Sequence, residues 1–310
     1  GCDLAPDFSK PDVKIPASFK EVSAEDTAPI TDGRWQKADP EAVQRFAKGE
    51  WWRVFDDRTL NRLIRAGHKK SPTLEATRER LNQARAQTGV AESSLYPDVT
   101  LGAGAQRQRQ STANPNIPPG IAADPYTLYN AKVGFDYGLD VFGRARNNAL
   151  AALLREEEQE QTYRAAKLTL EADIAETYFT LRALRTEEAL LEQTLKLREE
   201  TLNLTQKRYE LGDVSDLEVS RAEGESATTR GELVSVRERR AVTEHRLAIL
   251  TGEPPASFVV NTSDIIAPPP AIPAGLPSSL LERRPDVARA EREMRATNAQ
   301  IGLARAAFFP

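Results

Sequence analysis

The residues able to do chemistry are few and widely spaced in this 310-residue chain. His68 and His245 are its two histidines, and neither lies in a His-Glu-x-x-His motif or another spacing that binds metal, so each is expected to be a helix-surface residue. Cys2 is the single cysteine, so one chain forms neither a disulfide framework nor a cysteine-based zinc site. We therefore expect no catalytic residue, no cofactor and no metal site, and we interpret the protein as a non-enzyme.

Two other patterns resemble catalytic motifs only in part. Gly102-Ala103-Gly104 lacks the later glycine of a dinucleotide-binding loop and precedes a Gln/Arg-rich segment rather than a helix. The run at 156–158 consists of three glutamates, but consecutive helix residues point in different directions, so solvation is the expected explanation. Neither pattern predicts an active site.

Composition excludes two further classes of protein. The chain has 42 basic and 46 acidic residues and a net charge of −4, so it lacks the cationic surface on which nucleic-acid binding relies. Charged residues make up 28% of it, and no stretch approaches the roughly 18 apolar residues of a membrane-spanning helix. We therefore expect no nucleic-acid partner and no helical membrane protein.

The position of Cys2 is informative. A small residue, Gly1, precedes it, as at the cleavage site of a bacterial lipoprotein, and the chain then continues to about Ala38 without a hydrophobic period. This pattern predicts lipidation at Cys2, where two or more acyl chains would give stable anchoring. An incidental free thiol is the alternative.

Two segments alternate between apolar and polar residues with a period of two. The first begins at Val99, and the second extends without interruption from Tyr129 to Val141, which is long enough for the roughly 9 to 11 tilted residues that cross a bilayer. A half-buried strand of a soluble sheet would alternate in the same way. The apolar positions expected on a lipid-facing side are Val99, Leu101, Ala103, Tyr129, Ala131, Val133, Phe135, Tyr137, Leu139 and Val141.

A helical pattern follows from about Arg144 to Leu211 without a proline or glycine. Such a helix would extend roughly 100 Å, which no compact domain accommodates. Its apolar residues recur at seven-residue steps, so it needs partner helices. After a turn at Gly212, a second helix is expected from about Asp216 to Leu250, and the pair predicts an antiparallel αα-hairpin.

An internal repeat links two parts of the chain. Laying Pro72 on Pro285 pairs Gly89 with Gly302 and Pro97 with Pro310, among other matches. The first copy continues into strands and the long helix, whereas the second stops at Pro310. We therefore expect the chain to be incomplete at its C-terminal end.

The second copy carries a specific resemblance. Residues 276–287 (LPSSLLERRPDV), with their continuation to 308–310 (FFP), resemble the signature of TolC-like outer-membrane efflux channels, in the NodT/OprM-type lipoprotein branch that serves resistance-nodulation-division pumps. Residues 137–144 (YGLDVFGR) resemble the end of that family's second strand, and 247–252 (LAILTG) its helix end before the equatorial region. The resemblance covers essentially the whole chain.

This resemblance implies a homotrimer in the outer membrane of a Gram-negative bacterium, lipid-anchored at Cys2 and with a large periplasmic part. The fold class is then mainly α with a membrane β-hairpin: a very long α-helical coiled hairpin forming a periplasmic tunnel, plus β-strands of a trimeric outer-membrane β-barrel. A periplasmic adaptor protein and an inner-membrane resistance-nodulation-division pump are the implied partners. The implied adaptor-contact tip consists of Leu211, Gly212, Asp213, Val214, Ser215 and Asp216.

We therefore interpret the protein as the outer-membrane channel component of a tripartite efflux system, a passive conduit for small molecules such as drugs or metals. A periplasmic adaptor with a helical hairpin and a type I secretion outer-membrane component are the alternatives. The expected regions are a lipidated extended segment (1–50), periplasmic helices of repeat 1 (51–97), two membrane β-strands with an extracellular loop (98–142), the helical hairpin (143–252), a Pro-rich equatorial linker (253–279) and the first helix of repeat 2 (280–310).

Overall fold

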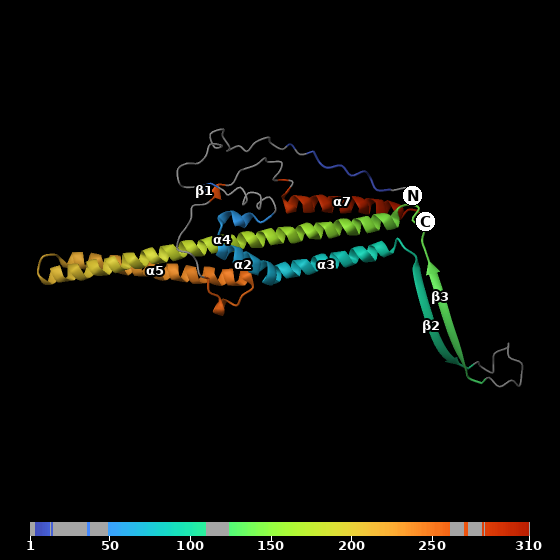
Figure 1. Cartoon of the computed structure of the whole chain (residues 1–310), viewed down its shortest axis with the longest axis horizontal. Coiled ribbons are helices and arrows are strands. Elements are labelled where there is room, and N and C mark those ends of the chain that lie inside the picture. Colours follow the sequence, from blue (N-terminus) through green and yellow to red (C-terminus); the bar gives the residue numbers. More distant parts are fainter. Residues whose placement is uncertain are drawn as a thin grey trace. The chain divides into compact units, whose positions relative to one another are not determined.

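The computed structural model describes residues 4–12, 14, 36–37, 49–109, 124–260, 270–271, 281 and 283–309. Cys2, most of the expected segment 1–50 and most of the linker 253–279 lie outside the described residues. The fold is mostly helical with a small β part, as predicted (Figure 1). Its elements are β1 (Gln36–Lys37), the 3-10 helix η2 (Trp51–Phe55), α2 (Arg58–Lys70), α3 (Pro72–Ser93), β2 (Asp98–Gln108), β3 (Tyr126–Asp136), α4 (Arg144–Glu210), α5 (Asp216–Thr251), the 3-10 helix η3 (Pro255–Ser257), β4 (Pro270–Ala271) and α7 (Pro285–Ala306).

The chain divides into two compact units. Unit 1 comprises residues 1–12, 81–159 and 289–310, and unit 2 comprises residues 13–80 and 160–288. Each unit is described by itself below.

The long helix is present as predicted. α4 is one helix of 67 residues, about 100 Å long at 1.5 Å per residue. Within the described part of the chain, no helix is both long enough and apolar enough to cross a membrane. α4 ends one residue earlier than expected, and α5 ends one residue later.

In unit 2, α4 and α5 lie side by side and antiparallel, with a short turn between them (Figure 1). The buried positions of α5 follow steps of three and four residues, which is the spacing of one helix face. They include Ser226, Thr229, Leu233 and Val236.

The hydrophobic core of unit 2 forms where α2 packs on α4 and α5. Leu60 and Ile64 of α2, Ile174 and Leu181 of α4, and Leu247 of α5 are completely buried there. A Cβ atom at Gly67 would lie 2.5 Å from the Cδ1 atom of Ile174, so the glycine lets α2 approach α4 closely. Burial of each such aliphatic side chain contributes roughly 1.5–3 kcal/mol.

The carboxylates of Glu171 and Asp57 form hydrogen bonds that join the elements around this core. Glu171 of α4 is almost fully buried and accepts hydrogen bonds from Trp51 Nε1 at 3.1 Å and from His68 at 2.7 Å. Asp57 caps α2 by accepting the backbone N–H groups of Thr59 and Leu60. The expectation of His68 as a helix-surface residue is therefore wrong, because it reaches a buried acid 103 positions away in the sequence.

The same Asp57 carboxylate also binds α4. It accepts the Tyr178 hydroxyl at 2.7 Å and the Arg182 guanidinium at 3.2 Å. Burial, followed by the hydrogen bond to Asp57, raises the pKa of Tyr178 to about 12. α4 thus supplies Glu171 to Trp51 and His68, while Asp57, which caps α2, binds Tyr178 and Arg182 of α4. These contacts satisfy polar groups that would be costly to bury without a partner.

In unit 1, the first part of α4 is flanked by α3 and α7. The glutamates at 156–158 each bind a different arginine: Glu156 binds Arg85 of α3, while Glu157 and Glu158 bind Arg292 and Arg289 of α7. Their side chains diverge, as expected from helix geometry, but they join helices rather than being merely solvated.

The β2–β3 pair is an antiparallel ribbon of eleven residues per strand (Figure 1). Its register pairs Val99 with Phe135 and Leu101 with Val133, so odd-numbered residues of both strands share one face. The register therefore gathers on one face the apolar residues from Val99 to Ala105 and from Tyr129 to Phe135, as the alternation predicted.

The second strand is displaced from its expected bounds. β3 begins at Tyr126 and ends at Asp136, so Tyr137, Leu139 and Val141 follow the strand rather than forming part of it. β2 begins at Asp98, which pairs with Asp136, and Pro97 before it has no backbone N–H to donate. Residues beyond 136 therefore have no strand residue opposite them with which to form hydrogen bonds. Asp140 accepts the N–H groups of Ala145 and Arg146 instead and caps α4. Burial raises the pKa of this carboxyl, but those hydrogen bonds outweigh it and leave the pKa of Asp140 below its ordinary value.

The two glycines that end the long helices predict unequal effects of the same substitution. Gly252 has φ +68°, and a Cβ there would lie 2.4 Å from the Lys70 carbonyl oxygen, whereas Gly212 has φ +76° and open space around it. Gly212→Ala should lower the free energy of unfolding by about 1 kcal/mol, from left-handed strain alone. Gly252→Ala should cost about 3 kcal/mol, because backbone must also move. Urea unfolding measures both, and equal losses would contradict this account.

Candidate functional surfaces

The first candidate surface is the apolar face of the ribbon, defined by the odd-numbered residues of β2 and β3. Exposed fractions of its large side chains run from 65% at Val99 to 82% at Leu101, with Tyr129, Val133 and Phe135 between. Ala103 and Ala131 lie on the same face and are exposed too. A contiguous apolar surface of this kind is unfavourable in water and is typical of a site that contacts a membrane or another protein.

The opposite face of the ribbon is thin and mostly polar, with Tyr126 and Leu128 as its large apolar residues at one end. Lys132 lies over Gly102, Asn130 over Gly104 and Thr100 over Gly134, each close enough that a Cβ on the glycine would collide with it. Glycines thus let polar side chains fold flat across the neighbouring strand. The ribbon has two chemically different faces, which a half-buried soluble strand also has, but its apolar face is uncovered by the described residues.

The second candidate surface is the tip, residues 211–216. The Gly212 N–H donates to the Tyr209 carbonyl and the Asp213 N–H to the Arg208 carbonyl, which is a Schellman motif. The Arg208 guanidinium binds the Asp213 carboxylate at 2.7 Å and fixes the turn. Leu211 is 84% exposed, so a large apolar side chain is held on a rigid turn in water.

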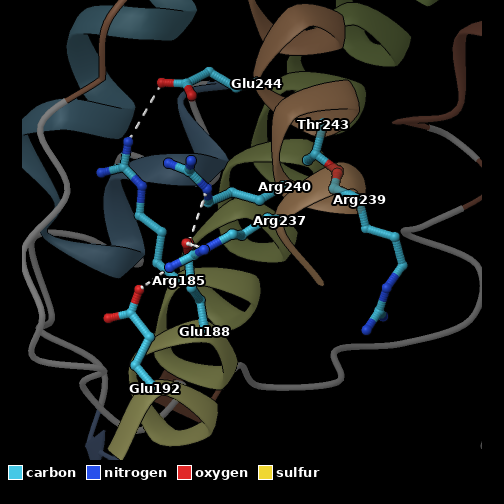
Figure 2. Close-up of polar contacts among 8 residues, drawn as sticks. All are labelled: Arg185, Glu188, Glu192, Arg237, Arg239, Arg240, Thr243 and Glu244. Carbon is cyan, nitrogen blue, oxygen red and sulfur yellow. Dashed lines mark hydrogen bonds and ion pairs between the residues drawn. The ribbon is translucent and has the colours of Figure 1, made fainter. Parts of the chain in front are cut away.

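Between tip and core, an ion-pair ladder joins α4 to α5. Glu188 binds Arg237 at 3.0 Å and Arg240 at 2.9 Å, and Arg237 also binds Glu192 at 2.6 Å (Figure 2). The hydrogen bonds that Arg237 donates to Glu192 and Glu188 raise its pKa. Further pairs are Arg185–Glu244, Arg239–Glu187, Arg230–Glu199 and Arg198–Glu225.

The seven-residue series of apolar residues on α4, such as Ile174, Leu181 and Leu195, is interrupted by charged residues, and the ladder explains two of these interruptions. Glu188 and Arg198 occupy seven-residue positions where leucine recurs in the sequence, and both bind charged residues of α5. Opposite charges at such positions fix the register of a helix pair.

Sequence analysis missed the acids Asp57 and Glu171. Asp57, placed before Thr59 and Leu60, carries a recognisable helix-cap signal. Glu171 carries no signal, since Trp51 lies 120 positions from it in the sequence. Cys2 lies outside the described residues, so the structure does not test its lipidation.

Comparison with known proteins agrees with this geometry. A family model described as outer membrane efflux protein matches residues 63–253, more than half of the chain. The chain belongs to the outer membrane efflux protein family. The family predicted from residues 276–287 and 308–310 is thereby confirmed.

Individual members of the family are similar over the whole chain. The alignment with the probable efflux pump outer membrane protein TtgC of Pseudomonas putida has 32% identity and covers 100% of this chain and 62% of that protein. A membrane protein from Pseudomonas aeruginosa superposes with a TM-score of 0.79 at 28% identity, covering 99% of this chain and 66% of that one. The outer-membrane channel OprN gives 0.78 at 27% identity, covering 99% and 65%. The chain thus spans about 62% of the length of the curated relative TtgC.

The ladder predicts unequal contributions from two glutamates. Glu188 binds two arginines and is 16% exposed, whereas Glu192 binds one and is 50% exposed. Glu188→Gln should lower the free energy of unfolding by about 1–2 kcal/mol, and Glu192→Gln by no more than about 0.5 kcal/mol, because solvent screens exposed pairs. Urea unfolding at low salt and in 1 M NaCl tests this. Equal losses for the two variants, or a Glu188→Gln loss that grows with salt, would contradict it.

Proposed function

We propose that the protein is the outer-membrane channel component of a tripartite efflux system, a passive conduit through which small molecules such as drugs or metals leave the cell. The observation that carries this proposal is the exposed apolar face of β2–β3, followed after a short turn by the 67-residue α4. A ribbon suited to hydrocarbon and a helix too long for a compact domain suit a protein that crosses both membrane and periplasm.

The apolar face would contact lipid of the outer membrane. Lipid offers no hydrogen-bond partners, so the strands would have to close with others into a barrel. Its residues are Val99, Leu101, Ala103, Tyr129, Ala131, Val133 and Phe135, and we assign Tyr137, Leu139 and Val141, which follow β3, to the membrane boundary.

A homotrimer is supported by a second apolar stripe on α4. Leu190, Leu197 and Leu204 recur every seven residues and are 60–63% exposed, away from the positions that face α5. The hydroxyls of the neighbouring Thr194 and Thr201 donate to carbonyls of their own helix, so only their methyl groups remain to be covered. Such a stripe fits packing against further helices, as in a tunnel wall.

Lipidation at Cys2 would add a second attachment to the outer membrane, with most of the protein in the periplasm of a Gram-negative cell. At the tip, Leu211, Gly212, Asp213, Val214, Ser215 and Asp216 would contact a periplasmic adaptor, which would connect the channel to an inner-membrane resistance-nodulation-division pump. The pump would supply the energy, so the channel needs no catalytic, cofactor or metal site of its own.

The relatives favour this interpretation over the alternatives. TtgC is named a probable efflux pump outer membrane protein and OprN an outer-membrane channel. A periplasmic adaptor would have no use for a lipid-facing ribbon. A type I secretion component would share the fold and differ in its pump.

The membrane assignment predicts that a lysine impairs assembly on the apolar face of β3 but not on its polar face. In the full-length protein, Ala131→Lys, at the middle of β3 on the apolar face, should reduce the amount of assembled outer-membrane trimer at least tenfold, because a charge near the bilayer midplane costs about 2–4 kcal/mol. Asn130→Lys, on the polar face, is the matched control and should leave assembly unchanged. Membrane fractionation and native gels measure both, and equal assembly of the two variants would refute the assignment.

The tip assignment predicts a loss of export without a loss of assembly. Leu211→Asp should lower cross-linking to the adaptor and the resistance of cells to pump substrates by tenfold or more, since it places a charge in an apolar contact. Leu211→Met should behave as wild type. Normal resistance with Leu211→Asp would show that the tip is not the docking surface.

A further inference from the structure

α2 carries a row of cations on the side turned away from the core of unit 2. The cations follow steps of four, three and four residues, which places them on one face of the helix. Their side chains are exposed, whereas the buried residues of α2 lie on the opposite side. We call this row the basic stripe, and it consists of Arg58, Arg62, Arg65 and Lys69.

Other basic residues of α2 have acidic partners, but the basic stripe has none. Lys70 binds Glu253 at 2.5 Å, and the His68 ring binds Glu171 at 2.7 Å. The carboxylate of Asp57, next to the stripe in sequence, is occupied by the start of its own helix and by α4. Within the described part of the chain, no carboxylate forms an ion pair with a residue of the stripe.

An ordinary solvated helix face mixes both signs of charge, and α2 does not. The helix contains five lysines and arginines and no acidic residue. The whole chain has the opposite balance, with 46 acidic against 42 basic residues. α4 and α5 carry both signs and pair them in the ion-pair ladder. The basic stripe is therefore a local exception to the composition of the protein.

The stripe is unfavourable in the protein without a ligand. Like charges three or four positions apart on a helix repel each other, and every neighbouring pair of the stripe has this spacing. Arg58 also lies in the first turn of α2, where the helix dipole favours an acid over a base. A bound anion would relieve both kinds of repulsion.

The layout of the stripe selects the shape of the anion. Its ends, Arg58 and Lys69, lie about 16 Å apart along the helix axis at 1.5 Å per residue. Charges laid out in a row suit an extended anion, whereas a compact phosphate group is bound by donors that converge on one point.

An extended acidic peptide has the matching spacing. Its alternate side chains lie on the same side about 6.5 Å apart, close to the roughly 6 Å of a four-residue helical step. Three carboxylates on alternate residues span about 13 Å and therefore fit within the length of the stripe. Each carboxylate then lies within reach of two long basic side chains.

A membrane surface fits the stripe less well. A helix that lies on a membrane inserts its apolar face between lipids. The apolar side of α2 is already buried against α4 and α5 in the core of unit 2. None of the exposed large apolar side chains of the described residues belongs to α2. The stripe thus offers charge without an apolar surface beside it.

We propose that the basic stripe of α2 is a docking site for an extended acidic segment of a partner protein, with carboxylates on alternate residues. Each carboxylate binds between two neighbouring cations of the stripe. The stripe lies within unit 2, so this docking site does not depend on the membrane assignment of β2–β3. It adds a contact on α2 to the one proposed for residues 211–216.

Binding of a model peptide tests the site. Fluorescence anisotropy with the full-length protein measures a short labelled peptide in which glutamate and threonine alternate. We expect saturable binding that weakens about fivefold or more between low salt and 0.5 M NaCl, because salt screens exposed charges. The same peptide with glutamine in place of glutamate should not bind. Inositol hexaphosphate, a compact phosphate probe, should bind more weakly than the acidic peptide.

Charge reversal separates docking from folding. Arg62→Glu combined with Arg65→Glu should weaken peptide binding about tenfold or more, since both cations beside the central carboxylate become repulsive. Arg221→Glu combined with Arg246→Glu, at two exposed positions of α5, makes the same change in net charge and should leave binding unchanged. The urea midpoint of the stripe variant should not fall, because two of its three repulsive neighbour pairs become attractive.

Four results would overturn the docking site. They are no binding of the acidic peptide to the wild-type protein, equal losses in the two double variants, a lower urea midpoint of the stripe variant, and tighter binding of inositol hexaphosphate than of the peptide. Export and membrane assembly play no part in these measurements, so their failure leaves the proposed function intact.

Discussion

The structure depends on one constraint: a helix of 67 residues cannot bury its own apolar side chains. Among the described helices, α2, α3, α5 and α7 cover parts of this helix. α5, with α2, covers the part of α4 in unit 2, and α3 and α7 flank the part in unit 1. Because contacts with α4 recur along its length, a few buried or ionic side chains at each level fix its neighbours.

Charged residues perform much of this work. Glu188 and Arg198 replace leucines in the stripe facing α5, and the glutamates at 156–158 reach arginines on two helices. Exposed pairs of this kind contribute little each, so their main effect is on register and choice of partner rather than on total stability. Buried Glu171 and half-buried Asp57 differ, since leaving either unpaired would cost more than losing an exposed pair.

The internal repeat gives the same helix two roles. α3 and α7 share their proline starts and their glycines, yet in α7 Asn298 and Arg305 bind the backbone carbonyls of Pro6 and Leu4, whereas Arg85 and Glu92 stand at those positions of α3. Four positions of that helix face, 291, 295, 298 and 305 in α7, differ between the two helices, and this is enough to change what the face binds.

The sequence by itself determined the elements: the period of two gave the ribbon and its apolar face, and the absence of proline and glycine gave α4, since both are local patterns. It also gave the family, through residues 276–287 and 308–310. Only the tertiary structure decided where β3 ends, that His68 meets Glu171, and that Gly302 but not Gly89 receives another segment. Those outcomes join residues some hundred or more positions apart, or depend on what a strand has left to pair with, and no local pattern encodes such distances.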